Sequence, residues 1–127
     1  MYYEMDATAA DIRYKVLTAT VTPRPIAWVT TKSSAGIVNA APYSFFNVMG
    51  HEPPTLVLGL LRDPVKGFKD TAENILATGE FVVNLVSENL ASAMNITCMD
   101  APREISELEC AGLEAALEAS GLLDAWV

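Results

Sequence analysis

Cationic and hydroxyl side chains gather just before a predicted helix, where they could bind a phosphate group. Residues 62–71 read RDPVKGFKDT, and the helix is expected to begin at the end of this segment. Free backbone N–H groups and the positive end of a helix dipole favour an anion at such a position. Lys69 would add charge and Thr71 a hydroxyl donor. Lysine and threonine are also common at helix starts, so a solvated, capped turn explains the segment at least as well.

A second segment combines small, polar and aromatic residues in a way that suits a flat ligand. Residues 39–47 read NAAPYSFFN. Small alanine side chains would let a ring approach the backbone, Ser44 and Asn47 could donate hydrogen bonds, and the aromatic residues could exclude water. Each of the two phenylalanines, taken singly, is explained equally well as part of the core. The segment predicts a ring-binding surface only in combination with other features.

Other catalytic and metal-binding patterns are weak in this sequence. No Gly-x-Gly-x-x-Gly or Walker motif is present, which leaves a Rossmann or P-loop nucleotide site unsupported. His51, the only histidine, lies next to Glu52 in a proline-flanked loop without a nucleophile elbow. An ordinary loop residue or substrate contact is therefore favoured over a catalytic role, and no metal site is predicted. Cys98 and Cys110 lack a Cys-x-x-Cys spacing and are expected to be reduced, partly buried thiols.

The first half of the chain is predicted to form three strands that would position these segments. Residues 11–20 form either a short helix or an irregular lead-in, and the prolines after them stop any helix. Residues 26–31 and 37–41 read as a hairpin around the turn at 33–36, and Pro42 is expected to break its second strand. After an irregular connection at 50–54, the apolar run 55–61 predicts a strand buried on both faces.

The second half is predicted to alternate helix, strand and helix. Asp70 and Glu73 match a capping box for a helix that ends at Gly79, where a left-handed residue suits the helix end. Residues 81–86 predict a strand, Ser87 could cap a helix to about residue 96, and residues from Ser106 onward suggest another helix weakened by two glycines. Three consecutive strands followed by helices favour a mainly β, antiparallel barrel with helical insertions over a parallel α/β sheet.

Length, charge and hydropathy limit the kind of protein this is. A chain of 127 residues is expected to form a single domain across residues 1–127. The formal net charge of −8 argues against a nucleic-acid partner, because phosphate backbones are bound by clustered lysine and arginine. No apolar run has the roughly 18–20 residues needed to span a membrane, and the N-terminus has no signal-peptide pattern. We therefore expect a cytoplasmic protein with no membrane partner.

Taken together, the motifs resemble the flavin reductase-like, FMN-binding split-barrel family, which includes flavin reductases and flavoredoxins. The successive segments are RPIAWVTT from Arg24, NAAPYSFFN from Asn39, KDT with Asn74-Ile75, and GEFVVNL from Gly79. Their order and spacing are similar to the family pattern from about residue 14 to 113. The resemblance implies an FMN-binding split β-barrel, and an NAD(P)H-dependent oxidoreductase that passes hydride from nicotinamide C4 to flavin N5 without a general base.

The resemblance also implies a homodimer with FMN near the subunit interface and a defined set of contacts. Flavin or another small molecule would accept the electrons. Ser44, Lys69 and Thr71 would lie nearest the phosphate, and Asn47 and Arg62 would be further contacts. The complete cofactor-binding set implied is Thr30, Thr31, Asn39, Ala40, Ala41, Pro42, Tyr43, Ser44, Asn47, Arg62, Lys69, Asp70 and Thr71, with no catalytic residue.

The C-terminal part departs from the family pattern. Family members continue with further strands beyond residue 113, whereas residues 114–127 resemble none of that sequence. Four predicted strands would also leave a barrel incomplete at its C-terminus. Three explanations stay open: a fragment, a natural truncation or a shifted reading frame. The alternatives to a reductase are a flavoredoxin-like electron carrier without NAD(P)H activity and a truncated, non-catalytic structural protein.

Overall fold

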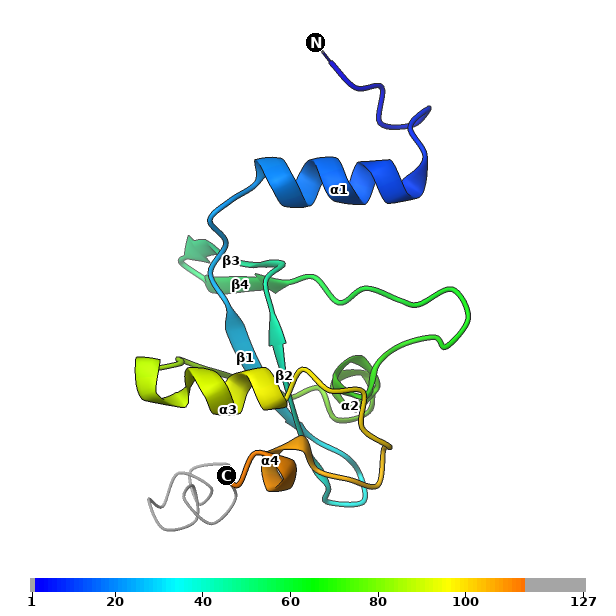
Figure 1. Ribbon diagram of the computed structural model, residues 1–127. Helices are drawn as coiled ribbons and strands as arrows, with labels where there is room; N and C mark the ends of the chain where they lie inside the picture. The colour runs from blue at the N-terminus through cyan, green and yellow to red at the C-terminus, as the bar shows by residue number, and fades with distance from the viewer. Residues whose placement is uncertain (1, 114–127) are drawn as a thin grey trace.

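Two small antiparallel sheets form the framework of the protein (Figure 1). The computed structural model describes residues 2–113. Strand β1 (Ala27–Lys32) pairs on one side with β2 (Val38–Tyr43) and on the other with β5 (Val82–Asn84). A separate hairpin consists of β3 (Phe46–His51) and β4 (Pro54–Leu58). The strands of the described part of the chain do not close into a barrel.

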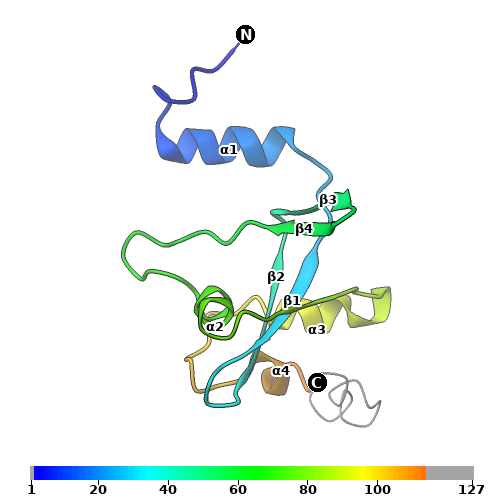
Figure 2. The same cartoon turned by 180° about the vertical axis from the view of Figure 1, so that it is seen from behind.

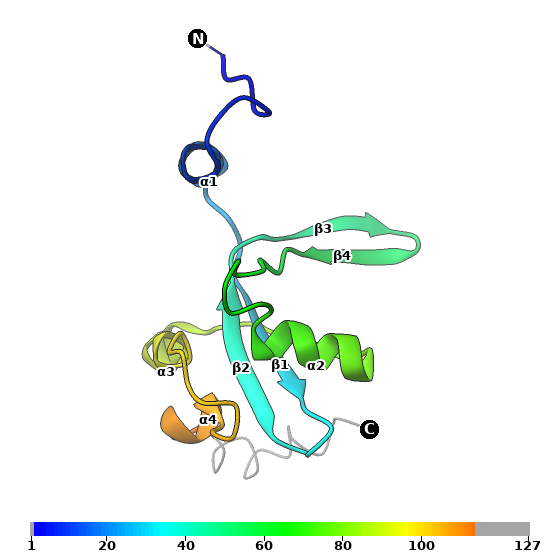
Figure 3. The same ribbon diagram turned by 90° about the vertical axis from the view of Figure 1, so that its right-hand side faces the viewer.

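Helices cover both faces of the three-stranded sheet. Helix α2 (Asp70–Thr78) lies on one side of β1 and β2, while α3 (Ala91–Ile96) and α4 (Glu107–Cys110) lie on the other (Figure 3). A 3₁₀ turn, η1 (Glu88–Leu90), leads into α3. Helix α1 (Ala10–Thr20) stands apart from the sheet, as the view from behind also shows (Figure 2). No helix in the described residues is long and apolar enough to cross a membrane.

The two faces of this sheet differ in chemistry because side chains alternate along each strand. On the α3 and α4 side, Trp28 and Ala40 pack against Leu108 and Leu113 to form the apolar core. The indole N–H of Trp28 donates to the Thr97 hydroxyl at 3.0 Å, so this polar atom is satisfied inside the core. On the α2 side, Thr31 and Asn39 lie opposite each other in the β1–β2 register, and the face becomes polar.

The strand predictions for residues 42–61 need three corrections. Pro42 does not end β2, which runs to Tyr43 with Pro42 opposite Trp28. The N–H of Ala40, two residues earlier, points away from β1, so a proline at 42 removes no ladder hydrogen bond at this sheet edge. Residues 50–54 are not an irregular connection, because β3 and β4 continue to a tight turn. The expected strand at 55–61 is exposed rather than buried, since its hairpin projects from the body (Figure 3).

The predicted helices form, but some of their boundaries and capping interactions differ from the prediction. Residues 11–20 are helical, and Gly79 closes α2 with a φ of 76°, as predicted. The capping box is wrong: Lys69 is the N-cap residue, and the carboxylates of Asp70 and Glu73 pair with Arg103 instead. Ser87 makes no side-chain cap, and its hydroxyl donates to Asn89. The strand expected at 81–86 is limited to β5. The helix expected after Ser106 is present as α4, and the part of that prediction beyond residue 113 lies outside the described residues.

Candidate functional site

A cleft of about 360 Å³ lies at the N-terminus of α2. The end of β2, the loop at residues 63–69 and the segment between α3 and α4 form its walls. A neighbouring hollow of about 250 Å³ is lined by residues 42–45 and by Lys69. Tyr43 and Lys69 line both cavities. The two segments that sequence reasoning singled out, 39–47 and 62–71, therefore meet at one place.

The first turn of α2 leaves backbone donors available at this cleft. The N–H groups of Ala72 and Glu73 donate to the Lys69 carbonyl at 2.9 and 3.1 Å. The amides of Asp70 and Thr71 come before the first intrahelical bond and have no acceptor within the helix. These donors, together with the helix dipole, make the cleft suitable for an anion.

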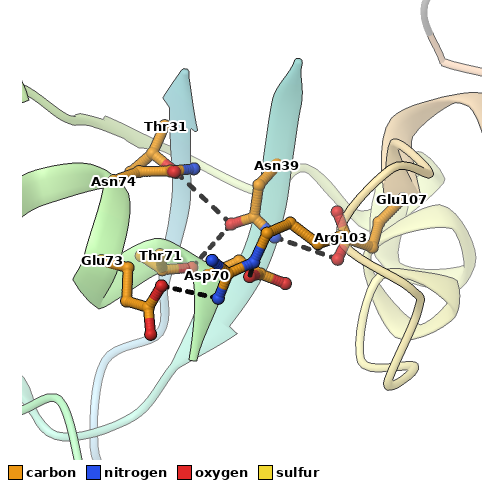
Figure 4. Close-up of polar contacts among 8 residues, drawn as sticks. All are labelled: Thr31, Asn39, Asp70, Thr71, Glu73, Asn74, Arg103 and Glu107. Atoms are coloured by element: carbon orange, nitrogen blue, oxygen red, sulfur yellow. Dashed lines mark hydrogen bonds and ion pairs between the residues drawn. The ribbon is translucent and has the colours of Figure 1, made fainter. Parts of the chain in front are cut away.

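A buried hydrogen-bond network fixes this helix end to the sheet (Figure 4). The Thr71 hydroxyl donates to Asn39 Oδ1 at 2.7 Å, and Asn39 Nδ2 donates to Glu107 Oε1 at 2.9 Å. Thr31 also donates to Asn39 Oδ1 at 3.4 Å and accepts from Asn74 Nδ2 at 3.0 Å. Asn39 thus links β2 to α2 and α4, and its side-chain amide has a single orientation that satisfies all of these partners.

Most charges around the cleft are already paired. Arg103 contacts Asp70 at 2.8 Å and Glu73 at 2.6 Å, and Lys66 contacts Asp100 at 2.7 Å. These ion pairs raise the pKa of Arg103 and of Lys66 and lower the pKa of Asp100.

Asp63 and Lys69, two further charged residues of the cleft, form no such ion pair among the described residues. The Asp63 carboxylate accepts backbone N–H groups of Lys66 and Val65, which lowers its pKa. Lys69 has no ion-pair partner among the residues that the structure describes. Lys69 is therefore the cation of this cleft that remains available for a bound anion.

Tyr43 lines both cavities, and its phenol has a shifted pKa. Burial raises the pKa of its phenol, and the nearby carboxylates of Glu107 and Asp70 act in the same direction. The contact with the Thr71 hydroxyl lowers the pKa, by less than burial raises it. The Tyr43 phenol therefore stays protonated to a higher pH than an exposed tyrosine, beside both the cleft and the more apolar hollow.

The structure brings together most, but not all, of the predicted contact residues. Asn39, Tyr43, Lys69, Asp70 and Thr71 line the cleft, and Pro42 and Ser44 line the hollow beside it. Thr31 and Ala41 are on the sheet face that contacts α2.

The remaining predicted contacts lie away from the cleft. Thr30 is on the opposite face and accepts from Asn84, while the Ala40 side chain lies in the core. The Arg62 guanidinium lies over the Phe68 ring, and Asn47 lines a separate apolar hollow beside α1. Ser44, by contrast, lines the hollow beside the cleft, and its hydroxyl accepts from Arg24 at 3.3 Å.

Sequence reasoning missed Arg103 and Glu107. Both come from the segment that closes the cleft from the C-terminal side, and Glu107 is 68 residues away from Asn39 in the chain. Each looks like an ordinary surface charge in an acidic, helix-forming stretch. No local pattern marks either residue, because each role depends on a contact that only the folded chain creates.

Comparison with known proteins gives the family. The model of the flavin reductase like domain matches residues 19–123. The chain belongs to this family. Curated relatives of the flavin reductase-like chain are 44–48% identical to it, and the chain spans about half of their length, 51–58%.

Solved structures agree with this family and define the fold. Nitrilotriacetate monooxygenase component B from Bacillus cereus is 35% identical with a TM-score of 0.80, over 88% of this chain and 55% of that one. The Pseudomonas fluorescens 2-nitrobenzoate 2-nitroreductase is 40% identical with a TM-score of 0.73, and the match covers 88% of this chain and 52% of that one. A Shewanella frigidimarina protein with a split barrel domain has a TM-score of 0.67 at 22% identity, and the match covers 88% of this chain and 56% of that one. The fold is a flavin reductase split barrel, as the sequence motifs predicted.

Proposed function

We propose that this chain binds FMN and takes part in an NAD(P)H-dependent flavin reductase reaction as a cytoplasmic homodimer. The observation that carries the proposal is the position of Lys69. In a chain of the flavin reductase-like family, this cation has no ion-pair partner within residues 2–113 and lies at the N-terminus of α2, beside two backbone amides with no acceptor in the helix. A phosphate monoester is the anion that these donors suit.

The residues around the cleft fit the phosphate end of FMN. The carboxylates that would repel a phosphate are paired or hydrogen-bonded: Asp70 with Arg103, Asp100 with Lys66, and Glu107 with Asn39. The Thr71 hydroxyl already donates to Asn39, so it would offer its lone pairs rather than its proton to a ligand. Phosphate binding would therefore depend on Lys69 and the backbone amides of Asp70 and Thr71.

The adjoining hollow fits an apolar ring better than a second anion. Pro42, Phe45 and Leu61 line it together with the polar edge of Ser44. When bound, the flavin supplies the electron transfer that none of these side chains can perform. The protein would bind the phosphate, exclude water from the ring and donate hydrogen bonds to its edge.

FMN binding to the purified chain tests the cofactor site. We expect Lys69→Ala to weaken FMN binding by about tenfold or more, since it removes the charge-assisted contact to the phosphate. Flavin fluorescence quenching would give the dissociation constants. Lys32→Ala is the matched control, because Lys32 is an exposed cation that lines neither the cleft nor the hollow. Equal affinities of the wild type and Lys69→Ala would contradict the proposed phosphate site.

The nicotinamide part of the proposal needs a separate measurement. FMN-loaded protein mixed with NADH or NADPH under anaerobic conditions should lose its flavin absorbance within seconds to minutes. Stable absorbance with both nucleotides would contradict the reductase reaction and favour a flavoredoxin-like electron carrier.

A further inference from the structure

The carboxylate of Glu107 lies at the centre of the buried network behind the cleft. Glu107 is 5% exposed and Asn39 is 8% exposed, so neither side chain can rely on water as a partner. The two oxygens have different partners: Oε1 accepts from Asn39 Nδ2 at 2.9 Å, and Oε2 accepts from the backbone N–H of Ala40 at 3.3 Å. The short helix α4 thereby provides an acceptor for one backbone N–H on the open edge of β2.

The contact with Glu107 determines which way the Asn39 amide faces. Because the carboxylate can only accept, it holds the NH₂ group of Asn39 on its own side and leaves Oδ1 facing α2. That oxygen accepts the Thr71 hydroxyl at 2.7 Å, on the second residue of α2. A chain of two hydrogen bonds therefore connects α4 with the first turn of α2, where the free amides lie (Figure 4).

We propose that Glu107 is a positioning residue for phosphate recognition: through Asn39 and Thr71 it holds the first turn of α2 so that its free amides face the cleft. This inference rests on the proposed function, since it assigns a residue to the phosphate end of the same site. Glu107 does not touch the ligand in this scheme. Its negative charge alone would disfavour an anion in the cleft that it helps to line, so a purely electrostatic role and the positioning role predict opposite effects.

Glutamine at this position separates the two roles. Glu107→Gln keeps the shape of the side chain, but one of its two oxygens becomes an NH₂ donor. The variant cannot accept from both Asn39 and Ala40, so either the Asn39 amide loses the contact that orients it, or the buried Ala40 N–H beside it is left unpaired. Simple removal of a negative charge would strengthen anion binding, whereas loss of positioning would weaken it.

The experiment compares FMN with riboflavin, which has the same ring but no phosphate. Dissociation constants of both are measured by fluorescence quenching for the full 127-residue chain, for Glu107→Gln and for Glu109→Gln. The last variant is the matched control, since Glu109 is an exposed carboxylate on the same helix. We expect Glu107→Gln to lower FMN affinity by about tenfold, the loss typical of a disrupted buried hydrogen bond to a charged group. Riboflavin affinity should be unchanged, and Glu109→Gln should bind both ligands like the wild type.

Other outcomes overturn the inference. An equal loss of affinity for FMN and riboflavin would assign Glu107 a general structural role, and unchanged or stronger FMN binding would leave it without a positioning role. A wild type that binds neither ligand would contradict the proposed function itself, and the inference with it.

A second variant tests the inference if Glu107→Gln does not fold. If circular dichroism shows that Glu107→Gln is unfolded, Asn39→Ser removes the same link and leaves the Glu107 carboxylate in place. It must show the same selective loss of FMN affinity for the inference to stand.

Discussion

At the scale of single residues, the cleft is organised by how its polar groups are satisfied. Most of its carboxylates have a partner from a distant part of the chain, such as Arg103 for Asp70 or Asn39 for Glu107. Lys69 contrasts with them because it has no ion-pair partner in the described part of the chain. Burial and hydrogen bonding, rather than the number of charges, therefore explain how an acidic protein could hold the proposed anion site.

Tyr43 gives a pH dependence that follows from its surroundings. Its pKa is raised in the folded state, mainly by burial, above the ordinary value of about 10. Folding therefore favours the protonated phenol, and this contribution to stability is complete below about pH 10 and declines as the pH rises toward the folded pKa. The free energy of unfolding should fall less steeply in Tyr43→Phe than in the wild type above about pH 10.

Absorbance at 295 nm reports the tyrosinate directly. The difference between the titration curves of the wild type and Tyr43→Phe isolates this one phenol. Its midpoint should lie above the ordinary tyrosine value. A midpoint at or below about pH 10 would show that the phenol is not buried between the two cavities in solution.

At the scale of elements, helix α2 joins the proposed phosphate site to the rest of the fold. Its N-terminus is held by Asn39 on the buried side and by Arg103 on the exposed side. Its C-terminus depends on Gly79, whose N–H donates to the Ile75 carbonyl at 2.8 Å in a left-handed conformation. The orientation of the site therefore depends on both ends of one nine-residue helix.

Gly79→Ala should destabilise the protein by about 1 kcal/mol, because an L-residue with a side chain is strained at a positive φ. A Cβ at this position would meet no atom within 4 Å, so steric clash does not contribute. Urea denaturation should show a lower midpoint with an unchanged slope. Gly79→Asn is the control, since asparagine tolerates this conformation and should cost less. Increased stability in Gly79→Ala would mean that reduced entropy of the unfolded chain outweighs the strain.

The elements also show what a sequence can and cannot predict. Local signals predicted the β1–β2 hairpin, the span of α2 and its glycine end, because turns, prolines and helix spacing act over a few residues. The capping box failed because Arg103, about 30 positions away, competes for the same carboxylates. Cys98 and Cys110, expected to be partly buried, are exposed, although both are free thiols as predicted.

At the scale of the whole molecule, the β3–β4 hairpin leaves large apolar side chains exposed. Its sequence is apolar enough to have predicted a buried strand, yet Val48 and Met49 are each 62% exposed and Leu56 is 49% exposed. Val48 and Leu56 are cross-strand partners, so their side chains share one face. An exposed apolar face of this kind indicates an interaction surface. We expect it to contact a second copy of the chain, as the proposed homodimer requires.

Charged substitutions on this hairpin test that expectation. Light scattering coupled to size exclusion should give the mass of a dimer for the wild type and of a monomer for the double variant Val48→Lys, Leu56→Lys. Two lysines that lose their water on association would destabilise the interface but leave the exposed hairpin folded in the monomer. Val65→Lys adds the same charge at a loop residue that is 94% exposed and should remain dimeric. A monomeric wild type, or a double variant that still forms dimers, would show that this hairpin does not join two copies, and circular dichroism would verify that the variant is folded.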